Sequence, residues 1–364
     1  MTATTAPTTG RRTGRGVVAG RGGTIALVIA IALVAVFTVV ELIDDAAIFF
    51  QTLMKALALG SVYAIIALGF VLIFKATQTV NFSQGALGMC GALFLSFLVV
   101  DEHIPFTTLS NPLMNLGGPS WLPWVLSLFV ALGFAALLGL VIERLTIRPM
   151  IGEPLFSVAV ITLGLEIILR VFATDAVKIQ FRPIAAPWGT DTFTLWGAVI
   201  YWSYVAVMVA AAIAFVAVFF FYRSRTGIAM RAVAYDQEAA MAQGIKVGRV
   251  FAIAWGAGAV LAALGGIFAT QPPVSQTGAV EASTALVAFR ALPAVILGGL
   301  DSVQGALVGG LLIGLAEIYA GQYLSGQTDI LGAGYPLIVP YVVMIITLLV
   351  KPYGLFGTPE IRRV

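Results

Sequence analysis

Ten stretches of mostly apolar residues run through this chain, and each is close to the roughly 20 residues that a helix needs to cross a bilayer. Their approximate bounds are 24–43, 52–74, 84–100, 121–142, 155–173, 196–222, 250–270, 286–300, 304–321 and 332–350. Of the 364 residues, 60% are hydrophobic and 10% are charged, whereas about 25% are charged in an average soluble domain. A single core in a protein of this size cannot bury so much apolar surface, so most of the protein's surface must face lipid. The sequence predicts an all-α polytopic membrane protein with about ten transmembrane helices and excludes a soluble enzyme.

The basic residues predict the orientation, because Lys and Arg gather on cytoplasmic segments. Ten crossings place both termini on one side. If that side is the cytoplasm, 15 of the 20 Lys and Arg residues lie inside, two (Lys178 and Arg182) lie outside, and three fall within spans. The inside residues are Arg11, Arg12, Arg15, Arg21, Lys75, Arg144, Arg148, Arg223, Arg225, Arg231, Lys246, Arg249, Lys351, Arg362 and Arg363. We therefore expect both termini in the cytoplasm.

Three regions follow from this topology. Residues 1–23 are rich in Thr, Gly and Arg and lack apolar periodicity, so we expect a disordered cytoplasmic tail. Residues 24–350 form the transmembrane domain, and 351–364 form a cytoplasmic C-terminal tail. The segments 286–300 and 304–321 are short and joined by four residues, so a re-entrant hairpin followed by one span is an alternative to two spans.

The residue inventory leaves little room for catalysis. Cys90 is the single cysteine and His103 the single histidine, so we expect no metal or haem site and no disulfide. An intramembrane enzyme needs a nucleophile with a base, or metal ligands, at membrane depth, and the sequence offers neither. A Gly-x-x-x-x-Gly-Lys-Ser/Thr phosphate loop is also absent from the sequence. We expect no catalytic residues, no cofactor, no nucleic-acid partner and no ATP hydrolysis by this chain.

The longest segment expected in the cytoplasm after the tail is the loop 223–249. Asp236 suits an N-cap, the residues that follow are strong helix formers, and Gly244 suits the left-handed position after a helix. The pattern predicts a helix of about two turns over 237–243. So short a helix is marginal alone in water, so we expect something packed against it. Its surface combines the small Ala239 and Ala240 with a charged Glu238; a helix lying on the membrane surface is the alternative.

This loop resembles the coupling-loop signature of ABC importer permeases, Glu-Ala-Ala followed after three residues by Gly, which matches residues 238–244. Further stretches resemble one subgroup, the permeases of branched-chain amino acid ABC importers of the LivH type. They occur in the family's order at 59–69, 80–85, 142–144, 148–149, 298–307 and 351–357. The N-terminal tail and first span are long for this subgroup, and the external segments 101–121 and 174–196 match no motif of it.

The resemblance implies a type II-like ABC importer permease in the cytoplasmic membrane of a prokaryote. It also implies a second related permease of the LivM type, two cytoplasmic ABC ATPases and an extracytoplasmic solute-binding protein. In such a machine Asp236, Glu238, Ala239, Ala240 and Gly244 would form the helix that couples to the ATPases. The implied function is inward transport of branched-chain amino acids by alternating access. Urea and short-chain amide importers use similar permeases, so the solute stays open.

Four polar residues are candidates for the substrate pathway. Asn81, Ser83 and Gln84 precede one glycine-studded span, and Gln304 precedes another. Transporters often place broken helices and short polar side chains where substrate passes. Glycines also let helices approach closely without any role in transport, so both interpretations stand.

Charged residues within spans allow a second kind of site. Glu166 and Arg170 are four residues apart on one face of a helix, so we expect an ion pair, either structural or part of a gate. Lys55, Arg290 and Glu317 lie close enough to span ends for their side chains to reach the interface. A transporter driven by Na⁺ or H⁺ remains an alternative, with Glu166 as its candidate carboxylate, and a passive channel is another.

Overall fold

The computed structural model describes residues 45–105, 107, 109–115, 118–177, 181–324, 332 and 334–358. The chain divides into two units after Phe50, and the arrangement below is that of the second unit, Gln51–Val364. The expected tail 1–23, the expected span 24–43 and the last residues of the expected tail 351–364 lie outside the described residues.

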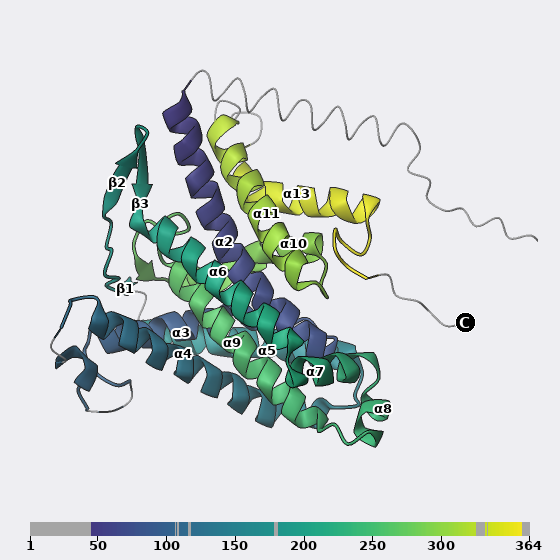
Figure 1. The fold of residues 1–364 in the computed structure, drawn as a ribbon. Helices are drawn as coiled ribbons and strands as arrows, with labels where there is room; N and C mark the ends of the chain where they lie inside the picture. Colours follow the sequence, from purple (N-terminus) through teal and green to yellow (C-terminus); the bar gives the residue numbers. More distant parts are fainter. Residues whose placement is uncertain are drawn as a thin grey trace, which may run out of the picture. The chain divides into compact units, whose positions relative to one another are not determined.

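Helices make up most of the described chain (Figure 1). In chain order the α-helices are α2 (Ala46–Thr77), α3 (Gln84–Val99), α4 (Leu122–Ile142), α5 (Leu155–Val177), α6 (Trp202–Arg223), α7 (Arg225–Tyr235), α8 (Gln237–Ala242), α9 (Val247–Ala269), α10 (Val287–Gly298), α11 (Val303–Tyr323) and α13 (Tyr335–Val350). Short turns are η1 (Pro112–Asn115), the π-helix η2 (Glu143–Ile147), η3 (Arg148–Met150) and η4 (Ala282–Leu286). The short strands β1 (Arg182–Pro183) and β4 (Ala279–Val280) pair antiparallel, as do β2 (Thr192–Leu195) and β3 (Ala198–Tyr201).

Every expected span from 52–74 onward overlaps one of these helices. Among the described residues, six helical segments are long and apolar enough to cross a membrane: α2, Leu122–Met150, Phe156–Asp175, α6, α9 and α11. Shorter apolar helices lie at Gln84–Val99, Ala282–Gly298 and Tyr335–Val350. The predicted polytopic helical fold is confirmed, while the number of ten crossings and the side of the termini stay predictions.

The expected span 196–222 begins too early. Residues 198–201 form strand β3, and α6 starts only at Trp202. Trp196 and Gly197 have φ of +52° and +83°, the left-handed pair that a tight hairpin turn between β2 and β3 requires. Ala198 is buried, Val199 exposed and Ile200 buried, which is the period of a strand. Hydropathy alone cannot separate such an apolar strand from the helix that continues it.

Helices α2, α3 and α9 form the buried centre, because small residues let their backbones meet. In the most apolar window of α2, 89% of residues are buried, against 28% in α4 and in α6. A Cβ on Gly88 of α3 would lie 2.7 Å from the Ala262 carbonyl oxygen of α9, and one on Gly310 of α11 would lie 2.6 Å from the Ala64 nitrogen of α2. The close-packing interpretation of these glycines is therefore confirmed by their geometry.

Helices α10, α11 and α13 pack together beside α2 (Figure 1). α10 has 12 residues, about 18 Å of helix, which is shorter than the roughly 30 Å hydrocarbon core of a bilayer. It ends at Gly299, whose φ is +106°. The C-terminal segment then caps it, since the amides of Leu355 and Phe356 donate to the carbonyls of Leu297 and Gly298 over 2.8 and 3.0 Å. With η4, α10 forms the apolar helical segment Ala282–Gly298, and both interpretations of this region, two spans or a re-entrant hairpin followed by one span, stay predictions.

Candidate coupling surface and membrane-embedded polar groups

The predicted coupling helix forms between α7 and α9. Ser224 caps α7 by accepting a hydrogen bond from the Gly227 amide through its hydroxyl (3.3 Å). Asp236 ends α7 and caps α8, because its Oδ1 accepts from the Ala239 amide over 2.9 Å. An N-cap carboxylate satisfies an amide that has no partner within the helix. The Asp236 cap and the short helix after it are both confirmed.

Gly244 ends this helix in the conformation that its sequence predicts. Its φ is +80°, which disfavours side chains with a Cβ. The Ile245 amide donates to the Ala240 carbonyl (3.0 Å), and the Gly244 amide donates to the Met241 carbonyl (2.9 Å). These two bonds define a Schellman motif. Local hydrogen bonds therefore satisfy backbone groups at both ends of α8 and stabilise its six residues as a helix.

One face of α8 is open to its surroundings. Ala240 is buried, whereas Glu238, Ala239 and the half-exposed Met241 are accessible. Tyr235, just before the cap, is 83% exposed. Of the five residues predicted to couple, Ala240 thus packs inward, and the other four lie at the surface. Tyr235 at the end of α7 and Met241 on α8 are both exposed and offer apolar surface that suits a groove in a partner.

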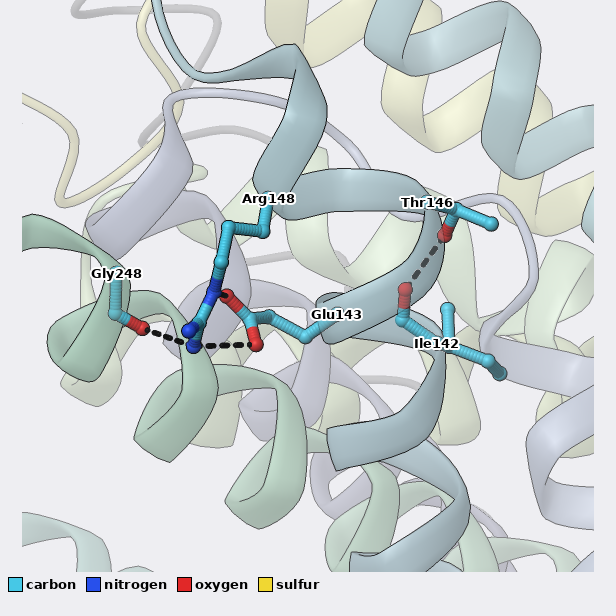
Figure 2. A network of polar contacts seen from close by, with 5 residues as sticks. All are labelled: Ile142, Glu143, Thr146, Arg148 and Gly248. Carbon is cyan, nitrogen blue, oxygen red and sulfur yellow. Dashed lines mark hydrogen bonds and ion pairs between the residues drawn. The ribbon is translucent and has the colours of Figure 1, made fainter.

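A network of polar contacts joins the end of this loop to the end of α4 (Figure 2). The Arg148 guanidinium donates to both carboxylate oxygens of Glu143 over 2.9 Å, and its Nη2 also donates to the Gly248 carbonyl of α9 over 3.0 Å. Glu143 is 1% exposed and lies in the π-helix η2. A bidentate pair of this kind is geometrically specific. The start of α9 is therefore held to the turn after α4, and the two ends are expected to move together.

The candidates Asn81, Ser83 and Gln84 come together in one buried cluster. Asn81 Oδ1 accepts from the Ser83 hydroxyl (2.6 Å) and amide (3.0 Å), while Asn81 Nδ2 donates to Gln84 Oε1 (3.1 Å). Gln84 Nε2 donates to the Gly258 carbonyl of α9 (3.1 Å). All three side chains are at most 1% exposed. Their polar atoms bind each other and α9, so this cluster fixes the start of α3 to the centre of the fold.

The fourth candidate lies apart from this cluster. Gln304 is exposed in the first turn of α11 and lines a cavity of about 330 Å³ with Lys75 and Asp301. Lys75 Nζ donates to the Asp301 carbonyl over 2.6 Å, which joins the end of α2 to the start of α11. The repeated sequence Gln-Gly-Ala-Leu at 84–87 and 304–307 therefore occupies two different environments.

Glu166 and Arg170 form an ion pair on α5, in which Arg170 Nε donates to Glu166 Oε1 over 2.6 Å. The Glu166 side chain is 6% exposed and that of Arg170 is 35% exposed. Partial exposure lets the guanidinium extend away from the apolar surface while it neutralises the buried carboxylate.

A second charged pair was missed by reasoning from the sequence. Glu317 of α11 binds Arg290 of α10 through Arg290 Nη2, and it accepts from the hydroxyl of Tyr63 of α2 over 2.7 Å. The expectation that Arg290 and Glu317 extend separately to the interface is wrong, because the Glu317 side chain is 5% exposed and pairs inside the fold. Charged residues at membrane depth usually pair with each other. Because Arg290 and Glu317 both lie within apolar stretches of the sequence, that rule could have predicted their pairing.

In the part of the chain that the structure describes, no three His, Cys, Asp or Glu residues gather in a way that could hold a metal ion.

The chain is similar to known transport proteins over most of its length. A family model described as "Branched-chain amino acid transport system / permease component" matches residues 52–348. The high-affinity branched-chain amino acid transport system permease protein LivH of Salmonella typhimurium is 29% identical over 325 residues, covering 87% of this chain and 98% of that protein. The high-affinity permease protein BraD of Pseudomonas aeruginosa is also 29% identical, over 87% of this chain and 98% of its own.

A further relative is similar over most of its length. The probable branched-chain amino acid transport permease protein LivH of Methanocaldococcus jannaschii is 26% identical and covers 83% of this chain and 90% of its own. A chain of PsaBC from Streptococcus pneumoniae in complex with Fab aligns with 88% of this chain and 97% of that chain, at a TM-score of 0.41 and 14% identity. That last likeness is too weak to support any inference. The family model, however, spans the helices from α2 to α13, and so this chain belongs to the family of branched-chain amino acid transport system permease components.

Proposed function

We propose that this chain is a transmembrane permease subunit of an ATP-driven ABC importer that carries branched-chain amino acids inward by alternating access. The observation that carries the proposal is α8, a helix fixed at both ends that leaves Glu238 and Met241 open to a partner, with the exposed Tyr235 just before it at the end of α7. The relatives are named as permeases for branched-chain amino acids, which supports the choice of substrate. Urea and short-chain amides are the competing solutes.

The proposed assembly contains more than this chain. It pairs with a second, LivM-type permease, binds two cytoplasmic ABC ATPases and receives its solute from an extracytoplasmic binding protein. It lies in the cytoplasmic membrane of a prokaryote with ten spans and both termini inside. The outward faces of α4, α5 and α6 are apolar, as lipid or a second permease requires; exposed examples are Phe129, Leu137, Phe156, Phe172, Ile213 and Phe220.

The geometry suggests how motion at α8 would reach the centre of the fold. Ile245 and Lys246 connect α8 to α9, and Arg148 holds Gly248 of α9 to Glu143 at the end of α4. α9 packs in turn on α3 and α4 through close contacts such as Gly139 against the Trp255 carbonyl. Close-packed interfaces shift as units rather than deform continuously. A displacement of α8 by ATPase closure would therefore be passed to α9, and from α9 to α3 and α4.

Within this proposal, the Asn81 cluster positions the start of α3 against α9, and Gln304 lies toward the cytoplasmic exit. The Glu166–Arg170 and Glu317–Arg290 pairs neutralise charges at membrane depth. Each pair leaves little free charge for a coupling ion, which favours ATP-driven transport over an ion gradient.

The test replaces Gly244 in the complete importer. Gly244→Val forces a β-branched side chain into φ of +80° and should abolish the end of α8, whereas Gly244→Asn tolerates the left-handed region and serves as the matched control. We expect membrane amounts of both variants to equal the wild type, leucine uptake to fall at least about tenfold in the Val variant, and the Asn variant to retain most uptake. Normal leucine uptake by Gly244→Val would contradict the coupling role, and uptake without any ATPase would contradict the transporter class.

A further inference from the structure

A cavity of about 330 Å³ lies where α2, α6, α7 and α11 end or begin, on the side where basic residues are expected to face the cytoplasm. Three basic side chains line it: Lys75 from the end of α2, Arg223 from the end of α6, and Arg231 from α7. This volume lies within the range of about 300–1,000 Å³ that is typical of small-molecule sites. The cavity is therefore large enough for a metabolite.

The basic groups are held in place and keep donors to spare. Lys75 Nζ uses one donor on the Asp301 carbonyl (2.6 Å), and Arg231 Nη1 uses one on the Tyr222 carbonyl (2.8 Å). The Arg223 guanidinium lies 4.3 Å from the centroid of the Phe219 ring. An ammonium has three donors and a guanidinium five, so most remain for a ligand.

Two further features favour an oxyanion in the same cavity. The first turn of α11, capped by Ser302, contributes Ser302 and Gln304 to its wall, so the positive end of a 21-residue helix faces it. Tyr222 also lines the cavity; it is 7% exposed, and its hydroxyl is buried with no hydrogen-bond partner. A buried hydroxyl without a partner carries an unmet cost that a polar ligand can relieve after a small side-chain adjustment.

The remaining lining residues complete the chemistry of an amphipathic zwitterion. The Asp301 carboxylate accepts from the amide (3.3 Å) and the hydroxyl of Thr358. A carboxylate offers about four acceptor positions, so Asp301 can still receive an ammonium group. Phe219, Val303 and Phe356 supply apolar wall. Cationic donors, one carboxylate and apolar wall together match an α-carboxylate, an α-ammonium and an aliphatic side chain.

We propose that this cavity is an intracellular binding site for an α-amino acid with an aliphatic side chain, and that its occupancy slows import. The proposal rests on the proposed substrate of the importer. Arg231 belongs to α7, which leads into α8 at Asp236, whereas Lys75 and Asp301 belong to the end of α2 and the turn before α11. A ligand that binds all three groups holds the coupling segment to α2 and α11. It therefore favours the arrangement in which it binds and opposes the displacement of α8.

The first test measures binding to the complete importer without its binding protein, in phosphatidylcholine nanodiscs with radiolabelled leucine as the probe. Asp301→Asn and Arg231→Gln each remove one charge-assisted contact, so each should weaken leucine binding about tenfold or more. Arg225→Gln is the matched control, because Arg225 is a cation on the same helix that lines a different cavity; it should bind leucine as the wild type does. 4-Methylpentanoate, which is leucine without its ammonium group, should bind the wild type about tenfold more weakly and lose this disadvantage in Asp301→Asn.

The second test measures initial leucine uptake by proteoliposomes that contain ATP, with and without leucine in the lumen. The uptake rate with lumenal leucine, divided by the rate without it, should fall below one in the wild type and in Arg225→Gln. The same ratio should stay near one in Asp301→Asn. The proposal would be overturned if the wild type does not bind leucine, or if Asp301→Asn and Arg231→Gln bind leucine as the wild type does. Displacement of leucine by phosphatidylglycerol would also overturn it, because a lipid headgroup would then be the occupant. If ATP-dependent leucine uptake persists in these cases, the transport function stands and only this site fails; if leucine uptake is absent from the wild type, the proposed substrate fails.

Discussion

Replacing Glu317 by leucine should destabilise the fold, because it leaves two polar groups without their partner. Arg290 loses its ion pair, and breaking a buried pair from one side costs about 3–5 kcal/mol. The Arg290 side chain is 28% exposed, so it can recover some solvation and the lower end applies. Tyr63 is fully buried and loses the acceptor 2.7 Å from its hydroxyl, at about 0.6–1.7 kcal/mol for a hydrogen bond in a membrane. Together these contributions predict a loss of about 4–5 kcal/mol in the free energy of unfolding.

A double-mutant cycle measures this interaction. The cycle compares Glu317→Leu, Arg290→Leu and the double variant by titration of the purified protein with SDS in mixed micelles, followed by tryptophan fluorescence. Replacing both members of a buried pair by apolar residues is often close to neutral. The double variant should therefore lose only about 1 kcal/mol, the share of the Tyr63 hydroxyl. Leu312→Ala, a change at a half-exposed position of the same helix, serves as the control and should change stability little.

Additive losses would refute this reasoning. If the double variant loses as much as the two single variants together, Glu317 and Arg290 do not interact in the folded protein. A loss below about 1 kcal/mol for each single variant would show that neither charge depends on the other.

Two further changes test the packing of the fold. Gly85→Ala places a Cβ against the carbonyl oxygen of Ala285, and this backbone atom cannot easily move away. The variant should therefore lose about 1–3 kcal/mol in the free energy of unfolding and give less monodisperse protein. Gly133→Ala is the control, because its Cβ meets nothing within 4 Å, and it should be neutral or stabilising. Trp124→Phe removes the Nε1–H that donates to the Ile184 carbonyl over 2.9 Å in a buried contact, and should cost about 1–3 kcal/mol in the same unfolding assay.

Features set by neighbouring residues could be predicted from the sequence. Asp236 and Gly244 define the ends of α8 because capping depends on the residue itself and on amides a few positions away. The Glu166–Arg170 pair is also local, since four residues bring two side chains onto one helix face. Spans 52–74 and later were found because bilayer thickness fixes the length of an apolar run.

Features set by contacts between distant segments could not be predicted in this way. Arg290 and Glu317 lie on different helices, and only the packing of α10 on α11 brings their side chains together. The hydrogen bond from Gln84 to the carbonyl of Gly258 in α9 likewise joins residues far apart in the sequence. Ala240 shares the alanine-rich surface predicted for α8, but the turn of the helix places it inward. In each case, tertiary packing decides which polar or small residues remain accessible.

Cross-linking from α8 tests the central claim most directly. Met241 is half-exposed, and Cys90 is the single cysteine of the chain, so Met241→Cys in a Cys90→Ser background gives one reactive thiol on this helix. A membrane-impermeant maleimide should label this thiol only from the cytoplasmic side of oriented vesicles, and a bifunctional cross-linker in the complete importer should join it to an ATPase subunit with an efficiency that changes with ATP. Labelling from the external side, or active leucine uptake with no cross-link to an ATPase in any nucleotide state, would contradict the account.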